Sequence, residues 1–110
     1  MRDRELPGFT HLQFLVLGVL LSGQQSGRAI RQAIGRYGIR RSAPAFYQMM
    51  ARLERDGTVE GWYEQVKVGD QYVTERRYRA TAAGSRMWER SQAFYEDVRV
   101  SVAERRWSDA

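Results

Sequence analysis

The sequence contains no cysteine, a single histidine and no long hydrophobic run. The absence of cysteine excludes a disulfide scaffold, a cysteine-ligated zinc site and thiol catalysis, and it fits a reducing compartment. Because no second histidine is present, we interpret His11 as an exposed residue of a first helical turn and not as a metal ligand. The longest apolar run, 14–21, is far too short to cross a bilayer, and no signal-peptide cleavage pattern follows the charged first residues. We therefore predict a cytoplasmic protein that has no membrane partner.

Patterns typical of enzymes are missing as well. Three carboxylates, Glu54, Asp56 and Glu60, lie close together in the sequence but are expected to face different ways. No nucleophile is accompanied by a base and an orienting partner, and the glycines do not form a phosphate-cradling loop. The sequence therefore predicts a protein that is not an enzyme and that requires neither a cofactor nor a metal.

What the sequence does contain is an excess of positive charge on a composition typical of a folded protein. Its 110 residues suit one domain, and 43% of them are hydrophobic, which is too many for a disordered chain. The formal net charge is +5 and the isoelectric point is about 10.1. Such an excess favours a polyanionic partner, most often nucleic acid. The alternative is a solvated basic surface that has no partner.

Two short helices are predicted near the start of the chain. Thr10 is placed to cap the first, which is apolar nearly all round and ends at 21–23. Such a helix should lie at the centre of the core or at a subunit interface. Ser26 is placed to cap the second helix, which should run from Gly27 to about Tyr37 and stop at Gly38.

The third predicted helix begins at Ser42 or Ala43, just before Pro44, and ends at Gly57. Helical spacing predicts that one stripe is buried: Phe46, Met50 and Leu53. The opposite face is then formed by Ala45, Tyr47, Gln48, Ala51, Arg52 and Arg55. This face combines small side chains with side chains that can form hydrogen bonds, so the helix can approach a partner closely.

A β-hairpin is predicted next. The segments Thr58 to Val68 and Tyr72 to Thr81 are rich in strand-forming residues, and Gly69-Asp70 marks the turn between them. Alternation along the second strand places Arg77 and Arg79 on one face and Arg76 with Tyr78 on the other.

The last predicted helix is long. Thr81 caps it, and it should run from Ala82 to about Arg106, a length of roughly 35–40 Å. Two neighbouring stripes carry its apolar residues: Met87, Phe94 and Val98, and Trp88, Tyr95 and Val102. Because so small a domain cannot cover the whole length, we expect a second copy of the chain to cover the rest.

Helix, helix, helix, hairpin and long helix is the order of a winged helix-turn-helix. We therefore predict a mainly α fold of the α+β winged-helix class, with three helices, a two-stranded wing and a long C-terminal dimerisation helix. The DNA-binding domain should span 1–81 and the dimerisation helix 82–110, within the same compact unit.

In this fold the third helix enters the major groove of double-stranded DNA, and the wing lies along the backbone. The predicted DNA-binding residues are Ser42, Ala45, Tyr47, Gln48, Arg52, Lys67, Arg76 and Arg77. Glutamine can pair with adenine through two hydrogen bonds, and arginine can do so with guanine. For each of these residues, the alternative is an ordinary solvated position on a helix face or hairpin edge.

Four segments of the chain resemble the PadR family of bacterial winged helix-turn-helix transcriptional regulators. They are Leu17-Gly18-Val19-Leu20-Leu21, Ser26-Gly27, Phe46-Tyr47-x-x-Met50-x-Arg52-Leu53-Glu54-x-x-Gly57 and Arg76-x-Tyr78-Arg79-x-Thr81-x-x-Gly84. The resemblance covers about residues 9–90. It implies a homodimer that binds a roughly palindromic operator and usually represses. Gln48 and Ala51 stand where the family often has proline and lysine, so the family's base preference does not carry over.

Two interpretations remain open for the aromatic residues of the last helix. In some relatives, aromatic side chains near the dimer interface line a pocket for flat apolar drugs or phenolic compounds, which implies a small aromatic effector here. The alternative is a dimer core. Either role falls to Phe14, Met87, Trp88, Phe94, Tyr95, Val98 and Val102. For the whole chain, the alternative function is a winged-helix protein-interaction module that does not bind DNA specifically.

Overall fold

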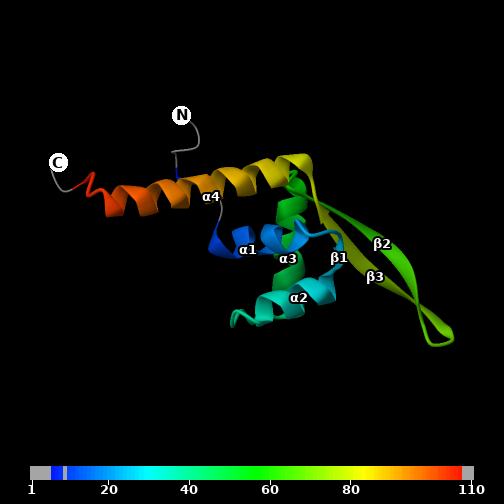
Figure 1. The fold of residues 1–110 in the computed structure, drawn as a ribbon. Coiled ribbons are helices and arrows are strands. Elements are labelled where there is room, and N and C mark those ends of the chain that lie inside the picture. The colour runs from blue at the N-terminus through cyan, green and yellow to red at the C-terminus, as the bar shows by residue number, and fades with distance from the viewer. Residues whose placement is uncertain (1–5, 9, 108–110) are drawn as a thin grey trace.

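A computed structural model describes residues 6–8 and 10–107 (Figure 1). The elements in chain order are α1 (His11–Leu20), β1 (Gln25–Ser26), α2 (Gly27–Gly35), α3 (Ala43–Arg55), β2 (Val59–Val68), β3 (Gln71–Ala80) and α4 (Ala82–Ala103). Four helices and a small antiparallel sheet make up an α+β winged helix, which confirms the predicted fold class. The two predicted ranges, 1–81 and 82–110, include residues 1–5, 9 and 108–110, which lie outside the described residues.

All four helices begin at the predicted N-caps. The side chains of Thr10, Ser26, Ser42 and Thr81 each accept a hydrogen bond from the backbone N–H three residues later. At α1 the bond is reciprocated, because the Gln13 side chain accepts from the Thr10 backbone N–H at 3.0 Å. A short polar side chain at this position satisfies a donor that the first helical turn leaves unpaired. The helix starts are therefore local properties of the sequence.

Two helix ends differ from the prediction. Helix α2 stops at Gly35, two residues before Tyr37, and the chain then turns through Gly38 at a φ of +81°. Helix α4 stops at Ala103 and not near Arg106. There Arg105 adopts a φ of +54°, and the Arg106 N–H donates back to the Ser101 carbonyl at 3.0 Å. This is a Schellman end in which arginine takes the position usually held by glycine, so no glycine marks it in the sequence.

The sheet contains the predicted hairpin and one short strand that was not predicted. Strands β2 and β3 pair along ten residues each, from Val59↔Ala80 to Val68↔Gln71, and the turn is Gly69-Asp70 as expected. Strand β1 pairs with β3 through Gln25↔Tyr78 and Ser26↔Arg77, so the strand order is β1-β3-β2. The short strand ties the start of α2 to the base of the wing.

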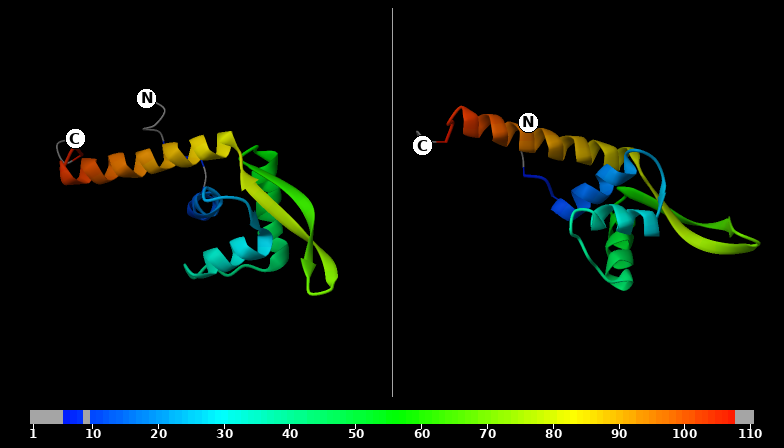
Figure 2. Two further views of the ribbon diagram at one scale, coloured as in Figure 1. Left: turned by 45° about the vertical axis from the view of Figure 1, so that its right-hand side comes forward. Right: turned by 60° about the horizontal axis from the view of Figure 1, so that its bottom comes forward.

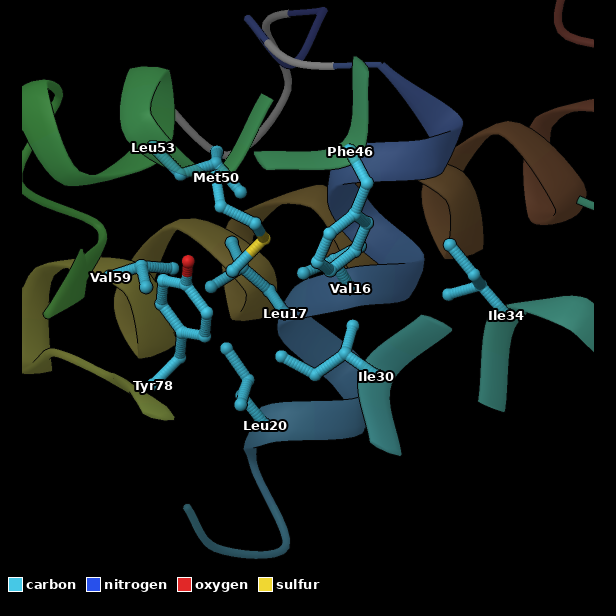
Figure 3. Close-up of a cluster of buried hydrophobic side chains, with 10 residues drawn as sticks. All are labelled: Val16, Leu17, Leu20, Ile30, Ile34, Phe46, Met50, Leu53, Val59 and Tyr78. Atoms are coloured by element: carbon cyan, nitrogen blue, oxygen red, sulfur yellow. The ribbon is translucent and has the colours of Figure 1, made fainter. Parts of the chain in front are cut away.

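The core lies where α1, α2, α3 and the base of the sheet meet (Figure 3). It contains Val16, Leu17, Leu20, Ile30, Ile34, Phe46, Met50, Leu53, Val59 and Tyr78. The buried stripe predicted for α3 is thereby confirmed. Tyr78 joins the core from β3 and is 2% exposed.

Two parts project from this core. The wing extends to one side, and the second half of α4 extends to the other, beyond α1 and α2 in every view (Figures 1 and 2). The molecule is accordingly elongated, with extents of 66 × 27 × 22 Å. Among the described residues, none of the helices combines the length and apolar character that crossing a membrane requires.

Candidate nucleic-acid interface

Helix α3 turns one face to the core and the other to solvent. Successive residues are rotated by about 100°, so the face opposite the buried stripe is centred on Gln48 and Arg55. Both side chains are exposed, and Ala51 lies between them. Because alanine projects little beyond the backbone, a flat surface of a partner can approach α3 here.

Tyr47 occupies one flank of this face. Its ring meets that of Phe46 edge-on, with centroids 5.1 Å apart, and it lies against the first residue of α2. A Cβ at Gly27 would stand 2.6 Å from the Tyr47 hydroxyl oxygen, so a larger residue there would displace the ring. Tyr47 is thus 36% exposed and held at the junction of α2 and α3.

Arg52 and Ala45 occupy the other flank. Together with Gln48 they border a shallow groove whose far side is formed by Thr10 and Gln13 at the start of α1. Arg41 enters the same groove from the loop before α3. That loop is tied to α2, because the Arg31 guanidinium donates to the Arg41 carbonyl at 3.3 Å. The groove therefore combines donor groups from α3, α1 and the connecting loop.

The positive charge of the chain is concentrated in the helices around this face. Residues 6–53 include no aspartate or glutamate, but they include six arginines: Arg28, Arg31, Arg36, Arg40, Arg41 and Arg52. In the remainder of the chain, acidic and basic residues nearly balance. A surface of one sign without opposing charges attracts a polyanion strongly. The α1–α3 region is therefore the part of the molecule best suited to approach phosphates.

The three cations predicted on the wing lie in two different environments. Lys67 is exposed beside the turn at the tip. Arg76 and Arg77 lie nearer the base of β3 and bond within the chain: Arg76 Nη2 to Glu54 at 2.7 Å, and Arg77 Nε to the Gln24 side chain at 3.0 Å. Arg77 also forms an ion pair with Glu75. The structure thus gathers Ser42, Ala45, Gln48 and Arg52 on α3, with Tyr47 at its flank, and places Lys67 apart at the tip; their contact with DNA stays a prediction.

One outward residue was left out of the predicted site. Arg55 lies at the centre of the exposed α3 face, next to Gln48 and Ala51 in the helical projection. Arg28, in the first turn of α2, is exposed as well. The signal that could have identified the basic surface was the stretch without carboxylates, because it restricts the positive charge to a single region of the sequence.

The aromatic residues predicted for dimerisation or a ligand meet between α1 and α4. The rings of Phe14 and Trp88 are parallel, with centroids 5.0 Å apart and an angle of 8°, and Tyr95 meets Phe14 edge-on at 6.2 Å. The Trp88 Nε1 is buried and is the one such side-chain atom without a hydrogen-bond partner among the described residues. Tyr95 and Val102 stay exposed, at 38% and 58%.

Within the part of the chain that the structure describes, no group of three or more histidine, cysteine, aspartate or glutamate residues is placed to hold a metal ion. The charge, hydrogen-bond donors and shape of the α3 face and its groove are the means by which proteins bind nucleic acids.

Comparison with known proteins places the fold. No family model and no curated protein sequence matches the chain, but solved structures do. One is a PadR family transcriptional regulator from Eggerthella lenta, which is 27% identical, with 84% of this chain and 79% of that chain covered and a TM-score of 0.64. A PadR family transcription regulator from Clostridium difficile is 13% identical, covers 86% of this chain and 97% of its own, and gives a TM-score of 0.72.

A third structure is Bacillus subtilis PadR in complex with operator DNA. It is 19% identical, with 73% of this chain and 45% of that chain covered and a TM-score of 0.57. Several of the similar structures are transcriptional regulators, a class without enzymatic activity, and the prediction of a non-enzymatic protein agrees with them. The chain has the winged-helix fold of these PadR-family structures, which confirms the resemblance found in its motifs.

Proposed function

We propose that this chain is a sequence-specific DNA-binding transcriptional regulator that acts as a homodimer on a palindromic operator and represses transcription there. The observation that carries the proposal is the exposed α3 face with Gln48, Arg52 and Arg55, together with the six arginines and no carboxylate of residues 6–53. The similarity to PadR-family structures, one of which was solved in complex with operator DNA, supports the proposal.

The two kinds of residue on α3 have different tasks in this proposal. Arginine contacts with phosphates would supply most of the affinity, because each releases condensed counterions from the duplex. Gln48 would supply direct readout, since its amide can donate to and accept from one adenine edge. Two-fold symmetry would place two α3 helices in successive major grooves, about one helical turn apart.

The first experiment is a titration of the protein's own promoter duplex, beside a scrambled duplex, at several salt concentrations. We expect the promoter to bind at least about 10³-fold more tightly, with log K falling steeply as log salt rises. Gln48→Ala should narrow that ratio by about 5- to 150-fold, the value of one bidentate base contact. Arg55→Ala should weaken both duplexes and reduce the salt slope by about one. Arg86→Ala, an exposed arginine on α4, is the matched control and should change neither quantity.

Each other outcome has a consequence. If both duplexes bind alike, the proposal of a sequence-specific regulator holds only if selection from random sequences yields a preferred site. If neither duplex binds at low salt, the DNA-binding proposal is wrong and a winged-helix protein-interaction module replaces it.

The proposed effector is a flat aromatic compound that enters between α1 and α4. Three features support it: the parallel Phe14–Trp88 pair, the exposed Tyr95 beside it, and the buried Trp88 N–H, which a phenolic oxygen could satisfy. We expect 1-naphthol to shift the indole N–H resonance of Trp88 in a saturable manner, while those of Trp62 and Trp107 stay in place. Trp88→Phe identifies the resonance, and the saturated analogue 1-decalol is the control. If 1-naphthol leaves all three resonances unchanged, the cluster is packing only and the effector proposal fails.

A further inference from the structure

Arg76 joins two elements that the proposed function brings to the same duplex, the wing and helix α3. Its Nη2 donates to Glu54 Oε1 at 2.7 Å, across 22 positions of sequence. Arg76 lies in β3, and Glu54 lies in the last turn of α3, on the side that faces the sheet. The side chains are only 24% and 26% exposed, so this pair is partly shielded from water and salt.

Aromatic rings hold the guanidinium in place. The Arg76 Cζ lies 4.6 Å from the centroid of the Tyr63 ring, which stands directly opposite on β2, and 5.5 Å from that of Tyr78. A guanidinium at such distances is attracted to the ring face. The Arg76 guanidinium is therefore bonded to α3 and packed against the rings of the sheet. A side chain held in this way is not free to follow a phosphate.

Gly61 lies beside the pair and has no side chain to collide with it. A Cβ at that position would stand 2.8 Å from Glu54 Oε1 and 2.9 Å from both Arg76 Nη2 and Tyr78 Cε1. Gly61 lies on β2 opposite Tyr78, at the place where α3 meets the sheet. A larger residue would have to displace the charged pair, the Tyr78 ring or both. Glycine at this position therefore leaves room for the pair and for the ring where the wing meets the helix.

The Arg76 guanidinium keeps its charge in this partly buried position. Burial lowers the pKa of Arg76, but hydrogen bonds to Tyr78 and Glu54 more than offset it, and the pKa is raised overall. Burial also raises the pKa of Tyr78, which keeps that phenol neutral. A phosphate that drew Arg76 away from Glu54 would leave that carboxylate partly buried and unpaired.

We propose that Glu54 and Arg76 form a strut that sets the angle between the wing and helix α3, so that Arg76 is a positioning residue for DNA recognition and not a phosphate contact. On sequence alone Arg76 is predicted to touch DNA; its position in the structure favours the strut. The inference rests on the proposed function, because a fixed angle matters only if α3 and the wing tip bind one duplex. In this proposal the angle of the wing, and through it the reading of bases by Gln48, depends on Arg76, which itself touches no base.

The two roles predict opposite effects for Glu54→Gln. If Arg76 contacts phosphate, removing the nearby carboxylate frees the guanidinium and strengthens binding to every duplex. If the pair is a strut, Glu54→Gln and Arg76→Gln should each lower the ratio of operator to scrambled affinity by about tenfold, the equivalent of one charged hydrogen bond. The double variant should be no worse than either single variant, and the salt slope on scrambled DNA should stay unchanged.

The matched control is the pair Glu60 and Arg79 on the opposite face of the hairpin. It is an ion pair with side chains 52% and 62% exposed, and it does not join the wing to α3. Its two Gln variants and their combination should leave the operator ratio unchanged. Arg76→Lys is a further check, because it keeps a cation but loses the planar group that stacks on Tyr63. If the pair is a strut, this variant should lower the ratio of operator to scrambled affinity. If Arg76 contacts phosphate, both that ratio and the salt dependence of binding should stay as in wild type.

A second readout uses no DNA, so the strut and the proposed function can fail separately. Urea unfolding of the four proteins in the Glu54–Arg76 cycle should be non-additive, with the double variant nearer to wild type than the sum of the single effects. Additive unfolding would overturn the strut even if DNA binding is specific. An Arg76→Gln variant that lowers the salt slope by about one, with Glu54→Gln binding more tightly, would overturn it in favour of a phosphate contact. Failure of the wild type to bind any duplex would overturn the proposed function and the positioning role together, while the unfolding cycle would still report on the pair.

Discussion

Gly84→Ala is expected to lower the free energy of unfolding by about 3 kcal/mol, at the upper end of what overpacking costs. A Cβ on this residue would stand 2.1 Å from the carbonyl oxygen of Thr58 and 3.2 Å from Leu17 Cδ2. The clash is with backbone, so no side-chain rotation can relieve it. The measurement is urea unfolding followed by circular dichroism at 222 nm.

The carbonyl that blocks this position is itself held firmly. It accepts a hydrogen bond from the Thr81 N–H at 3.1 Å, and the Thr58 N–H and hydroxyl both donate to the Leu53 carbonyl at 3.1 Å. These bonds join the end of α3 to the start of α4. To accommodate a methyl group at Gly84, α4 would have to move away from α3 and break part of this junction.

Gly35→Ala is the matched control for this prediction. Gly35 is also helical and glycine, but a Cβ there meets nothing within 4 Å outside its own helix. We expect a gain of about 0.5–1 kcal/mol, because alanine loses less backbone entropy in a helix. Equal midpoints for Gly84→Ala and wild type would show that the α3–α4 junction is looser than the structure has it.

The four helix starts could be predicted because each depends on residues within four positions of the cap. The hairpin faces could be predicted for a similar reason, since alternation alone separates Arg76 from Arg77. Strand β1 could not, because two residues carry no pattern of their own and become a strand only through pairing with β3. The end of α4 was missed because Arg105, and not a glycine, takes the left-handed conformation.

The candidate site shows the same division. That Phe46, Met50 and Leu53 are buried, and hence that Gln48 is exposed, follows from helical periodicity. The partner of Arg76 does not follow, because Glu54 is 22 positions away on another element and several carboxylates are nearer in sequence. The motif residues Glu54, Gly57 and Gly84 are explained only by the structure: one pairs with the wing, one turns the chain at a φ of +79°, and one admits the Thr58 carbonyl.

Val102→Asp is expected to convert a dimer into a monomer. Val102 is 58% exposed in the single chain, and seven-residue spacing places it in line with Tyr95 along α4. The second half of that helix projects beyond the core (Figure 1). A carboxylate there costs the isolated chain little, because the side chain already faces water. In a dimer that pairs two α4 helices it would place two charges inside an apolar seam, and a buried unpaired charge costs several kcal/mol.

The measurement is sedimentation equilibrium at several protein concentrations. Wild type should approach twice the chain mass of 12.8 kDa, and Val102→Asp should remain near 12.8 kDa with an unchanged helical spectrum. Ala93→Asp is the matched control: it adds the same charge to the same helix, at an exposed position on the opposite face. A wild type that stays monomeric at every concentration, or an Ala93→Asp variant that dissociates as readily, would refute a dimer built on this stripe.

Loss of the dimer should reach the DNA as well. Each subunit would still carry an intact α3 face, so Val102→Asp should bind a single half-site as tightly as wild type binds it. On a full palindromic operator the two faces of a dimer act together, and their linkage raises the affinity by about 10² to 10⁴. The monomeric variant should therefore lose that factor on the palindrome alone. If Val102→Asp weakens binding to the palindrome but not to the half-site, α4 contributes to DNA binding by pairing the two subunits. No contact between α4 and the duplex is then needed.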